Sequence, residues 1–217
     1  MDGPNAEAAR PRRQRSDGIR SREAILRQAA RLATLEGLEG LSIGRLADSV
    51  GMSKSGLFAH FRSKEELQLA AIETADTIFQ AEVVDPALRT PPGIGRLRAL
   101  CEAFLAHLER GVFPGGCFFA SVAAEIDTHP GPVRDRAMTT VASWFGQLET
   151  AVAESQAENA LDPAADAAQI AFELNAYLLL ANANYVATGD PAALDRARRA
   201  IDRLLESTKP ATASQPA

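Results

Sequence analysis

This 217-residue chain has few of the features on which several common classes of protein depend. Its two cysteines, Cys101 and Cys117, are too few for a disulfide scaffold, so a reducing compartment is the default. No apolar run approaches the roughly 18 residues that a membrane-spanning helix needs. Residues 1–20 contain arginines but no apolar stretch, which argues against a signal peptide. We therefore expect a cytoplasmic protein without a membrane partner.

Histidine is also scarce, with three residues in the chain. His107 and His129 have no third partner at metal-ligand spacing, so we expect neither a metal site nor a cofactor. No serine lies in the strained turn that presents a hydrolase nucleophile. We therefore expect that the chain is not an enzyme.

Charge is distributed unevenly along the chain. Residues 10–64 hold 12 Lys and Arg against 5 Asp and Glu, whereas the remaining residues hold 11 against 23. This asymmetry predicts a basic module that faces nucleic acid, attached to an acidic body with another task. The alternative is a basic disordered tail without a function of its own.

The apolar spacing is helical throughout, and no alternating strand pattern occurs, so we predict an all-α fold. Ser42, Ser53 and Ser63 are predicted helix caps, with Ser63 and Glu66 forming a capping box. "VVDPALRTPPG" is predicted to be a loop. The predicted helices span residues 21–36, 42–50, 53–61, 64–82, 94–110, 117–126, 132–152, 163–188 and 191–207.

The stretch "VGMSKSGLFAHFRSKEEL", residues 50–67, completes a helix-turn-helix, with Gly51 in the turn. The second helix of such a motif enters the major groove of DNA with its N-terminal residues at base edges. That geometry assigns Lys54 and Ser55 to the bases and gives Gly56 a close approach to the DNA backbone. His60 and Lys64 are predicted to contact phosphates.

The run "AILRQAARLATLEGLEGLSIGRLADSVGMSKSGLFAHFRSKEEL" resembles the DNA-binding domain of TetR-family transcriptional regulators. The resemblance implies an all-helical homodimer that binds a palindromic DNA operator, and a C-terminal domain whose small-molecule effector releases the DNA. It also gives Ser42 a phosphate contact. The sequence departs from the family at Phe58, where a tyrosine is usual, so no hydroxyl is available there for a phosphate.

The predicted domains follow from these assignments. They are a disordered basic arm (residues 1–18), a three-helix helix-turn-helix domain (19–66), a larger helical domain for ligand binding and dimerisation (67–208) and a disordered tail (209–217). In the arm, Arg12 and Arg13 of "RPRRQR" could enter the minor groove; a solubilising tail is the alternative.

The C-terminal helices carry aromatic residues interspersed with a few polar groups, as in a site for a hydrophobic small molecule. The far end of the fourth helix, at Phe79, is expected near this pocket. Core packing, or a dimer interface formed by the last two helices, would explain the same residues. The candidate ligand residues are Phe104, His107, Phe118, Trp144, Asn175 and Tyr177.

The functional prediction is a ligand-responsive transcriptional regulator, most simply a repressor. One alternative is a redox-responsive helical regulator that uses Cys101 and Cys117. The other is a helical enzyme or carrier whose basic end is incidental.

Overall fold

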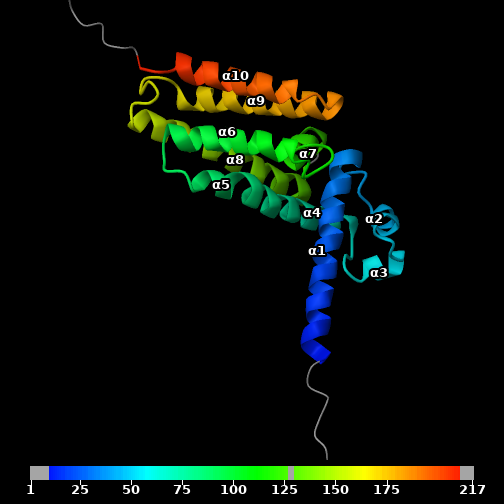
Figure 1. Cartoon of the computed structure of the whole chain (residues 1–217). Coiled ribbons are helices and arrows are strands. Elements are labelled where there is room, and N and C mark those ends of the chain that lie inside the picture. The colour runs from blue at the N-terminus through cyan, green and yellow to red at the C-terminus, as the bar shows by residue number, and fades with distance from the viewer. Residues whose placement is uncertain (1–9, 127–129, 211–217) are drawn as a thin grey trace, which may run out of the picture.

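The structure, a computed structural model, describes residues 10–126 and 130–210, with side chains from residue 22 onward. Every regular element in these ranges is helical, which confirms the all-α prediction. Figure 1 shows a compact head of short helices beside the long α1, joined to a stack of longer helices. The elements are α1 (Arg10–Glu36), α2 (Ile43–Val50), α3 (Lys54–Phe58), α4 (Lys64–Phe79), a π-helix (Gln80–Val84), α5 (Asp85–Leu88), α6 (Ile94–Glu109), α7 (Phe118–Ile126), α8 (Pro132–Ala157), α9 (Ala167–Thr188) and α10 (Ala192–Ser207).

The head forms around a small apolar core to which α1, α2, α3 and the first turns of α4 each contribute. Leu38, Leu46, Leu57 and Phe61 are all fully buried in it. Glycine allows the chain to reverse after α2, because Gly51 adopts the left-handed conformation with φ 68° and its N–H bonds to the carbonyl of Ala47. Short helices gain little from propensity alone, so this shared core and the caps hold α2 and α3 in place.

The body packs α6, α8, α9 and α10 together, with α7 between α1 and α8 (Figure 1). The continuous α4–π–α5 segment runs from the head along the body and contacts both α6 and α8. Arg198 of α10 pairs with Glu102 and Glu109 of α6, at 2.7 and 3.1 Å, on the side of the body away from the head. Helix α4 thus begins in the head, at Lys64, and the segment that continues from it packs against the body.

Two predictions about the chain's irregular segments are wrong. Helix α1 begins at Arg10, so residues 10–18 are not a disordered arm; Pro11 fits the first turn of a helix, and Gly18 costs only about 1 kcal/mol there. The predicted loop at 83–93 is helical as far as Leu88, since the π-helix (Gln80–Val84) continues directly into α5, with Pro86 near the junction. Residues 1–9 and 211–217 lie outside the described residues.

The other helix boundaries lie close to those predicted, except that α8 continues to Ala157, beyond the predicted end at residue 152, and that two further local differences occur. Helix α3 ends at Phe58 rather than at residue 61, and α9 begins at Ala167, after Asp166, whose carboxylate accepts bonds from the N–H groups of Ala168 and Gln169. No helix within the described ranges is long and apolar enough to span a membrane.

Candidate DNA-binding face and ligand cavity

Serine caps define the N-terminal ends of α2 and α3. Ser42 Oγ accepts a bond of 3.2 Å from the N–H of Arg45, and Ser53 Oγ accepts one of 3.1 Å from the N–H of Gly56. Both serines were predicted as caps, and the structure confirms that role. Because each hydroxyl satisfies an N–H that the helix leaves unbonded, the two short helices keep defined ends.

Helix α3 turns one apolar side chain inward and several residues outward. Leu57 is fully buried, whereas Lys54 and Ser55 are exposed at the N-terminal end of the helix. Phe58 is 54% exposed, which is unusual for a residue that could have joined the core. A solvent-facing ring on a short basic helix suits contact with a sugar or a thymine methyl.

Lys64 lies at the start of α4 and is already paired. Its Nζ atom lies 2.6 Å from the carbonyl oxygen of Glu39 and 2.9 Å from that residue's carboxylate. The lysine side chain is still 44% exposed, so a phosphate could compete with Glu39 for it. One half of the predicted capping box is present, since Ser63 Oγ accepts from the N–H of Glu66. The carboxylate of Glu66 accepts from the N–H of Arg62, one residue before the cap, rather than from that of Ser63.

The remaining residues predicted to contact DNA are either half-buried or have side chains outside the described part of the structure. His60 is half-buried, with its ring 6.3 Å from that of Phe61. Gly56 is half-buried, and a Cβ added there would lie 3.2 Å from Ser53 Oγ. The backbones of Arg12 and Arg13 belong to α1, and their side chains lie outside what the structure describes. These assignments therefore stay predictions.

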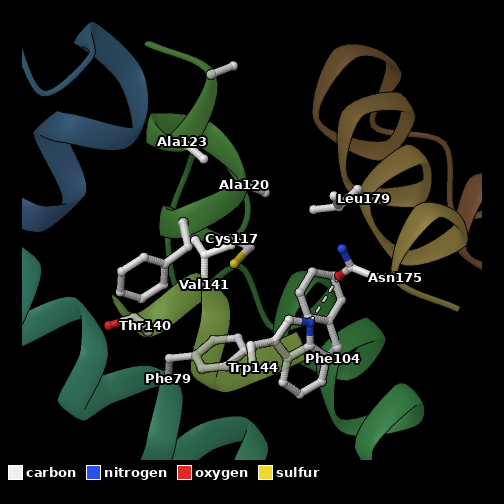
Figure 2. Close-up of a pocket in the computed structure, with 12 residues that line it drawn as sticks. Phe79, Phe104, Cys117, Ala120, Ala123, Thr140, Val141, Trp144, Asn175 and Leu179 are labelled. Atoms are coloured by element: carbon white, nitrogen blue, oxygen red, sulfur yellow. Dashed lines mark hydrogen bonds between the residues drawn. The ribbon is translucent and has the colours of Figure 1, made fainter. Parts of the chain in front are cut away.

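The body contains a cavity of about 200 Å³ between α4, α6, α7, α8 and α9 (Figure 2). Its floor is aromatic: the ring of Trp144 stacks on that of Phe104 at 5.7 Å, and Phe79 meets Trp144 edge-on at 5.3 Å. Small residues of α7 form the opposite wall. The lining residues are Phe79, Phe104, Cys117, Phe119, Ala120, Ala123, Ala124, Thr140, Val141, Trp144, Asn175 and Leu179.

Two polar side chains line this cavity. Asn175 Oδ1 accepts a hydrogen bond of 3.1 Å from Trp144 Nε1, which leaves the amide nitrogen of Asn175 with no bond to any described residue (Figure 2). The hydroxyl of Thr140 accepts a bond of 2.8 Å from Arg136, which also pairs with Asp76 of α4. No lining residue carries a charge.

The six residues predicted to bind a ligand separate into three groups. Phe104, Trp144 and Asn175 line the cavity. His107 and Phe118 are buried outside its lining, His107 with its ring 6.2 Å from that of Phe79. Tyr177 lies on the other side of α9, in a groove between α9 and α10. Helix α9 is apolar on almost every face, so its sequence did not reveal which side points inward.

The alanines of α7 and Thr140 were not predicted to line a cavity. A row of small residues resembles ordinary helix packing in a sequence, and only the placement of the aromatic rings opposite it reveals a cavity. Phe79, which was expected near the pocket, does line it.

His107 and the two cysteines are buried titratable groups in this part of the body. Burial, with a smaller contribution from the charge of Arg110, lowers the pKa of His107 to about 4, and neither ring nitrogen has a hydrogen-bond partner among the described residues. Burial raises the pKa of Cys101 to about 12 and that of Cys117 to about 11. Redox reactivity requires the thiolate, so these values argue against a cysteine switch.

Metal binding has no support in the described part of the chain, where no group of three or more His, Cys, Asp or Glu side chains could hold an ion. The predicted absence of a metal site rests on the spacing of the few histidines in the sequence, and His129 lies outside the described residues.

Comparison with known proteins places both halves of the chain. Residues 25–71 match the family model of bacterial regulatory proteins of the tetR family, and residues 93–201 match that of the tetracyclin repressor-like C-terminal domain. The regulator TcmR of Streptomyces glaucescens is 34% identical over 49% of this chain and 44% of its own length. The repressor AcnR of Corynebacterium diphtheriae is 41% identical over 29% and 33%. The chain thus spans less than half of these relatives.

Solved structures agree with the fold over most of the chain. A TetR transcriptional regulator from Chloroflexus aurantiacus superposes with a TM-score of 0.78 and 25% identity, covering 88% of this chain and 95% of its own. AibR, solved with isovaleryl coenzyme A and operator DNA, gives a TM-score of 0.67 and 23% identity, covering 86% and 96%. Because the relatives are named as transcriptional regulators, the prediction that the chain is not an enzyme is confirmed.

Proposed function

Because the chain belongs to the TetR family of bacterial transcriptional regulators, we propose that it is a ligand-controlled repressor. It binds a palindromic operator as a homodimer, and a small hydrophobic effector in the cavity releases it. The observation that carries the proposal is the outward face of α3, where Lys54, Ser55 and Phe58 are exposed while Leu57 anchors the helix in the core.

DNA recognition in this proposal uses α3 in the major groove. Lys54 and Ser55 reach base edges, and the exposed ring of Phe58 contacts a thymine methyl or a sugar. Lys64 exchanges its bond with Glu39 for a phosphate oxygen, so binding is sensitive to salt. The two copies of α3 read half-sites separated by about 34–36 Å or a multiple of that spacing.

The dimer in this proposal forms through α9 and α10. Of the large apolar side chains that the described structure leaves exposed, four lie on α9: Phe172, Leu179, Leu180 and Val186. One of these four, Leu180, borders a groove together with Tyr177, and Ala200 and Arg203 of α10 form the other side of that groove. A row of exposed apolar residues along one helix indicates a protein interface, and a second copy would bury it in a four-helix arrangement.

The effector in this proposal is small, uncharged and largely apolar. The cavity of about 200 Å³ lies below the usual range of about 300–1,000 Å³ for drug-sized ligands. A charged ligand would lose its hydration without meeting an opposite charge in the lining. An aromatic ring would stack against Trp144 or Phe104, and a single acceptor atom could take the unbonded amide hydrogens of Asn175.

Selection of duplexes from a random pool by the purified protein tests the proposal. We expect enrichment of a two-fold symmetric sequence, protected over both half-sites in footprinting. The proposal fails if no sequence is enriched, or if the enriched sequence lacks symmetry and is bound by a single chain.

A further inference from the structure

The turn after α1 is the point where the head, the body and the start of α4 meet. The N–H groups of Leu38 and Glu39 in this turn both donate to the carboxylate of Glu125, near the end of α7, at 2.7 Å each. These residues are separated by more than 80 positions in sequence. One side chain of the ligand-binding body thus holds two backbone groups of the DNA-binding head.

Gly37 shows how closely this contact is built. It has φ 79°, a conformation that favours glycine, and a Cβ added there would lie 2.7 Å from Glu125 Oε1. Any other residue would therefore be strained and would also collide with the carboxylate. The turn admits Glu125 only because position 37 has no side chain.

The same turn also holds the first turns of α4. The carbonyl of Leu38 accepts a hydrogen bond of 2.8 Å from the buried amide of Gln68, and the carbonyl of Glu39 accepts one from Lys64. The N–H groups of the same two residues, Leu38 and Glu39, donate to the carboxylate of Glu125. The carboxylate of Glu125 is thus one residue removed from Lys64, a predicted phosphate contact.

Helix α7 joins this contact to the cavity. Ala120, Ala123 and Ala124 line the cavity, and Glu125 follows directly in the chain. Figure 2 shows α7 standing between the lining side chains and the ribbon of the N-terminal helices. A ligand or side chain larger than the cavity must displace part of its lining, and the alanine wall belongs to a helix of nine residues.

We propose that Glu125 is the positioning residue through which the cavity controls the DNA-binding head. When a ligand fills the cavity, α7 moves. The carboxylate of Glu125 then either loses its two hydrogen bonds to the turn at residues 37–39 or pulls that turn with it, and the head leaves its DNA-binding orientation. This inference rests on the proposed function, since it requires that the protein binds DNA and that the cavity controls binding. It adds α7 to α4 as a physical link between the two parts.

Amide exchange tests the contact without DNA or ligand. We expect Glu125→Gln to speed hydrogen exchange at Leu38 and Glu39 by at least about 10-fold, because an amide offers one acceptor oxygen and places a donor against a donor. Glu149→Gln, an exposed glutamate on α8, is the matched control and should leave the exchange rates unchanged. Unchanged protection in Glu125→Gln would overturn the inference.

A cavity-filling substitution then tests the control of DNA binding. Val141→Phe adds a ring to the cavity from α8, and we expect it to weaken binding to the selected operator by at least about 10-fold in the wild-type background but less than about 2-fold in Glu125→Gln. An equal effect in both backgrounds, or no effect in either, contradicts the role of Glu125. If Glu125→Gln does not fold, Glu125→Asp replaces it, since the shortened carboxylate cannot hold both N–H groups.

The two levels of failure are distinguishable. If the wild-type protein enriches no duplex, the proposed function fails at its first step. If it binds an operator and Val141→Phe acts equally with and without Glu125, the regulator stands and only the inference about α7 falls.

Discussion

Trp144 Nε1 donates a hydrogen bond of 3.1 Å to Asn175 Oδ1, and this bond joins α8 to α9 at the edge of the cavity. It fixes the plane of the indole that stacks on Phe104 and orients the amide group beside it. A ligand that approaches Asn175 must therefore change the surroundings of Trp144, the chain's single tryptophan. Fluorescence of this residue reports on the cavity directly.

Asn175→Leu should weaken the binding of a small neutral phenol such as para-cresol by about 10-fold, because a hydrogen bond contributes about 1 kcal/mol and the leucine also narrows the cavity. Trp144 emission measures the binding. Asn184→Leu is the control on the same helix, since Asn184 bonds to the carbonyl of Leu180 away from the cavity. The carboxylate para-toluate, of similar shape, should not bind; equal binding of the two compounds would contradict an uncharged site.

Acid should destabilise the protein through His107. Its pKa is about 4 in the folded chain, against about 6.5 when unfolded, so the unfolded state binds the proton more readily. The free energy of unfolding should be fully retained above pH 6.5 and should fall by at most about 3 kcal/mol as the pH drops to 4. Urea unfolding at several pH values measures this loss.

His107→Leu removes the titrating group and should flatten that part of the pH profile. Carboxylates in general also titrate near pH 4. The two proteins are therefore compared by how steeply the free energy of unfolding changes between pH 6.5 and 5. Identical slopes there would show that His107 is not the group responsible.

Leu180→Asp should give a folded monomer with much weaker operator binding, because the charge lies on the exposed face of α9. Ile201→Asp should instead unfold the chain, since Ile201 is 5% exposed and packs against the body's own core. Light scattering and circular dichroism separate the two outcomes. A folded Leu180→Asp dimer would place the interface elsewhere.

Lys54→Ala should change which operator is preferred, whereas Lys64→Ala should weaken all duplexes about equally and lower the salt slope by roughly one. The loss at Lys64 is reduced by the bond that its ammonium group gives up with Glu39 on binding DNA. Titrations of selected and scrambled duplexes at several salt concentrations measure both effects. An unchanged slope for Lys64→Ala would mean that this lysine stays with Glu39.

Local signals in the sequence predicted the head well. Ser42, Ser53, Ser63 and Gly51 act at single positions, and each ends or begins a helix where expected. Proline was misread at residue 86 because it usually ends a helix, whereas here the π-helix continues directly into α5.

Long-range features of the body could not be predicted in the same way. Tyr177 was placed in the ligand pocket because α9 is apolar on most faces, and the structure turns it toward α10 instead. The bonds from Glu125 to residues 38 and 39 join segments 86 and 87 positions apart, and no local pattern marks them. Such contacts arise only from the packing of whole helices.

The most direct test of the regulator is the affinity of the wild-type chain for its selected operator against a scrambled duplex of equal length and composition. At physiological salt we expect a preference of at least about 10³-fold, with the logarithm of affinity falling linearly as the logarithm of salt concentration rises. Equal affinity for the two duplexes, or binding that does not respond to salt, would contradict a sequence-reading α3.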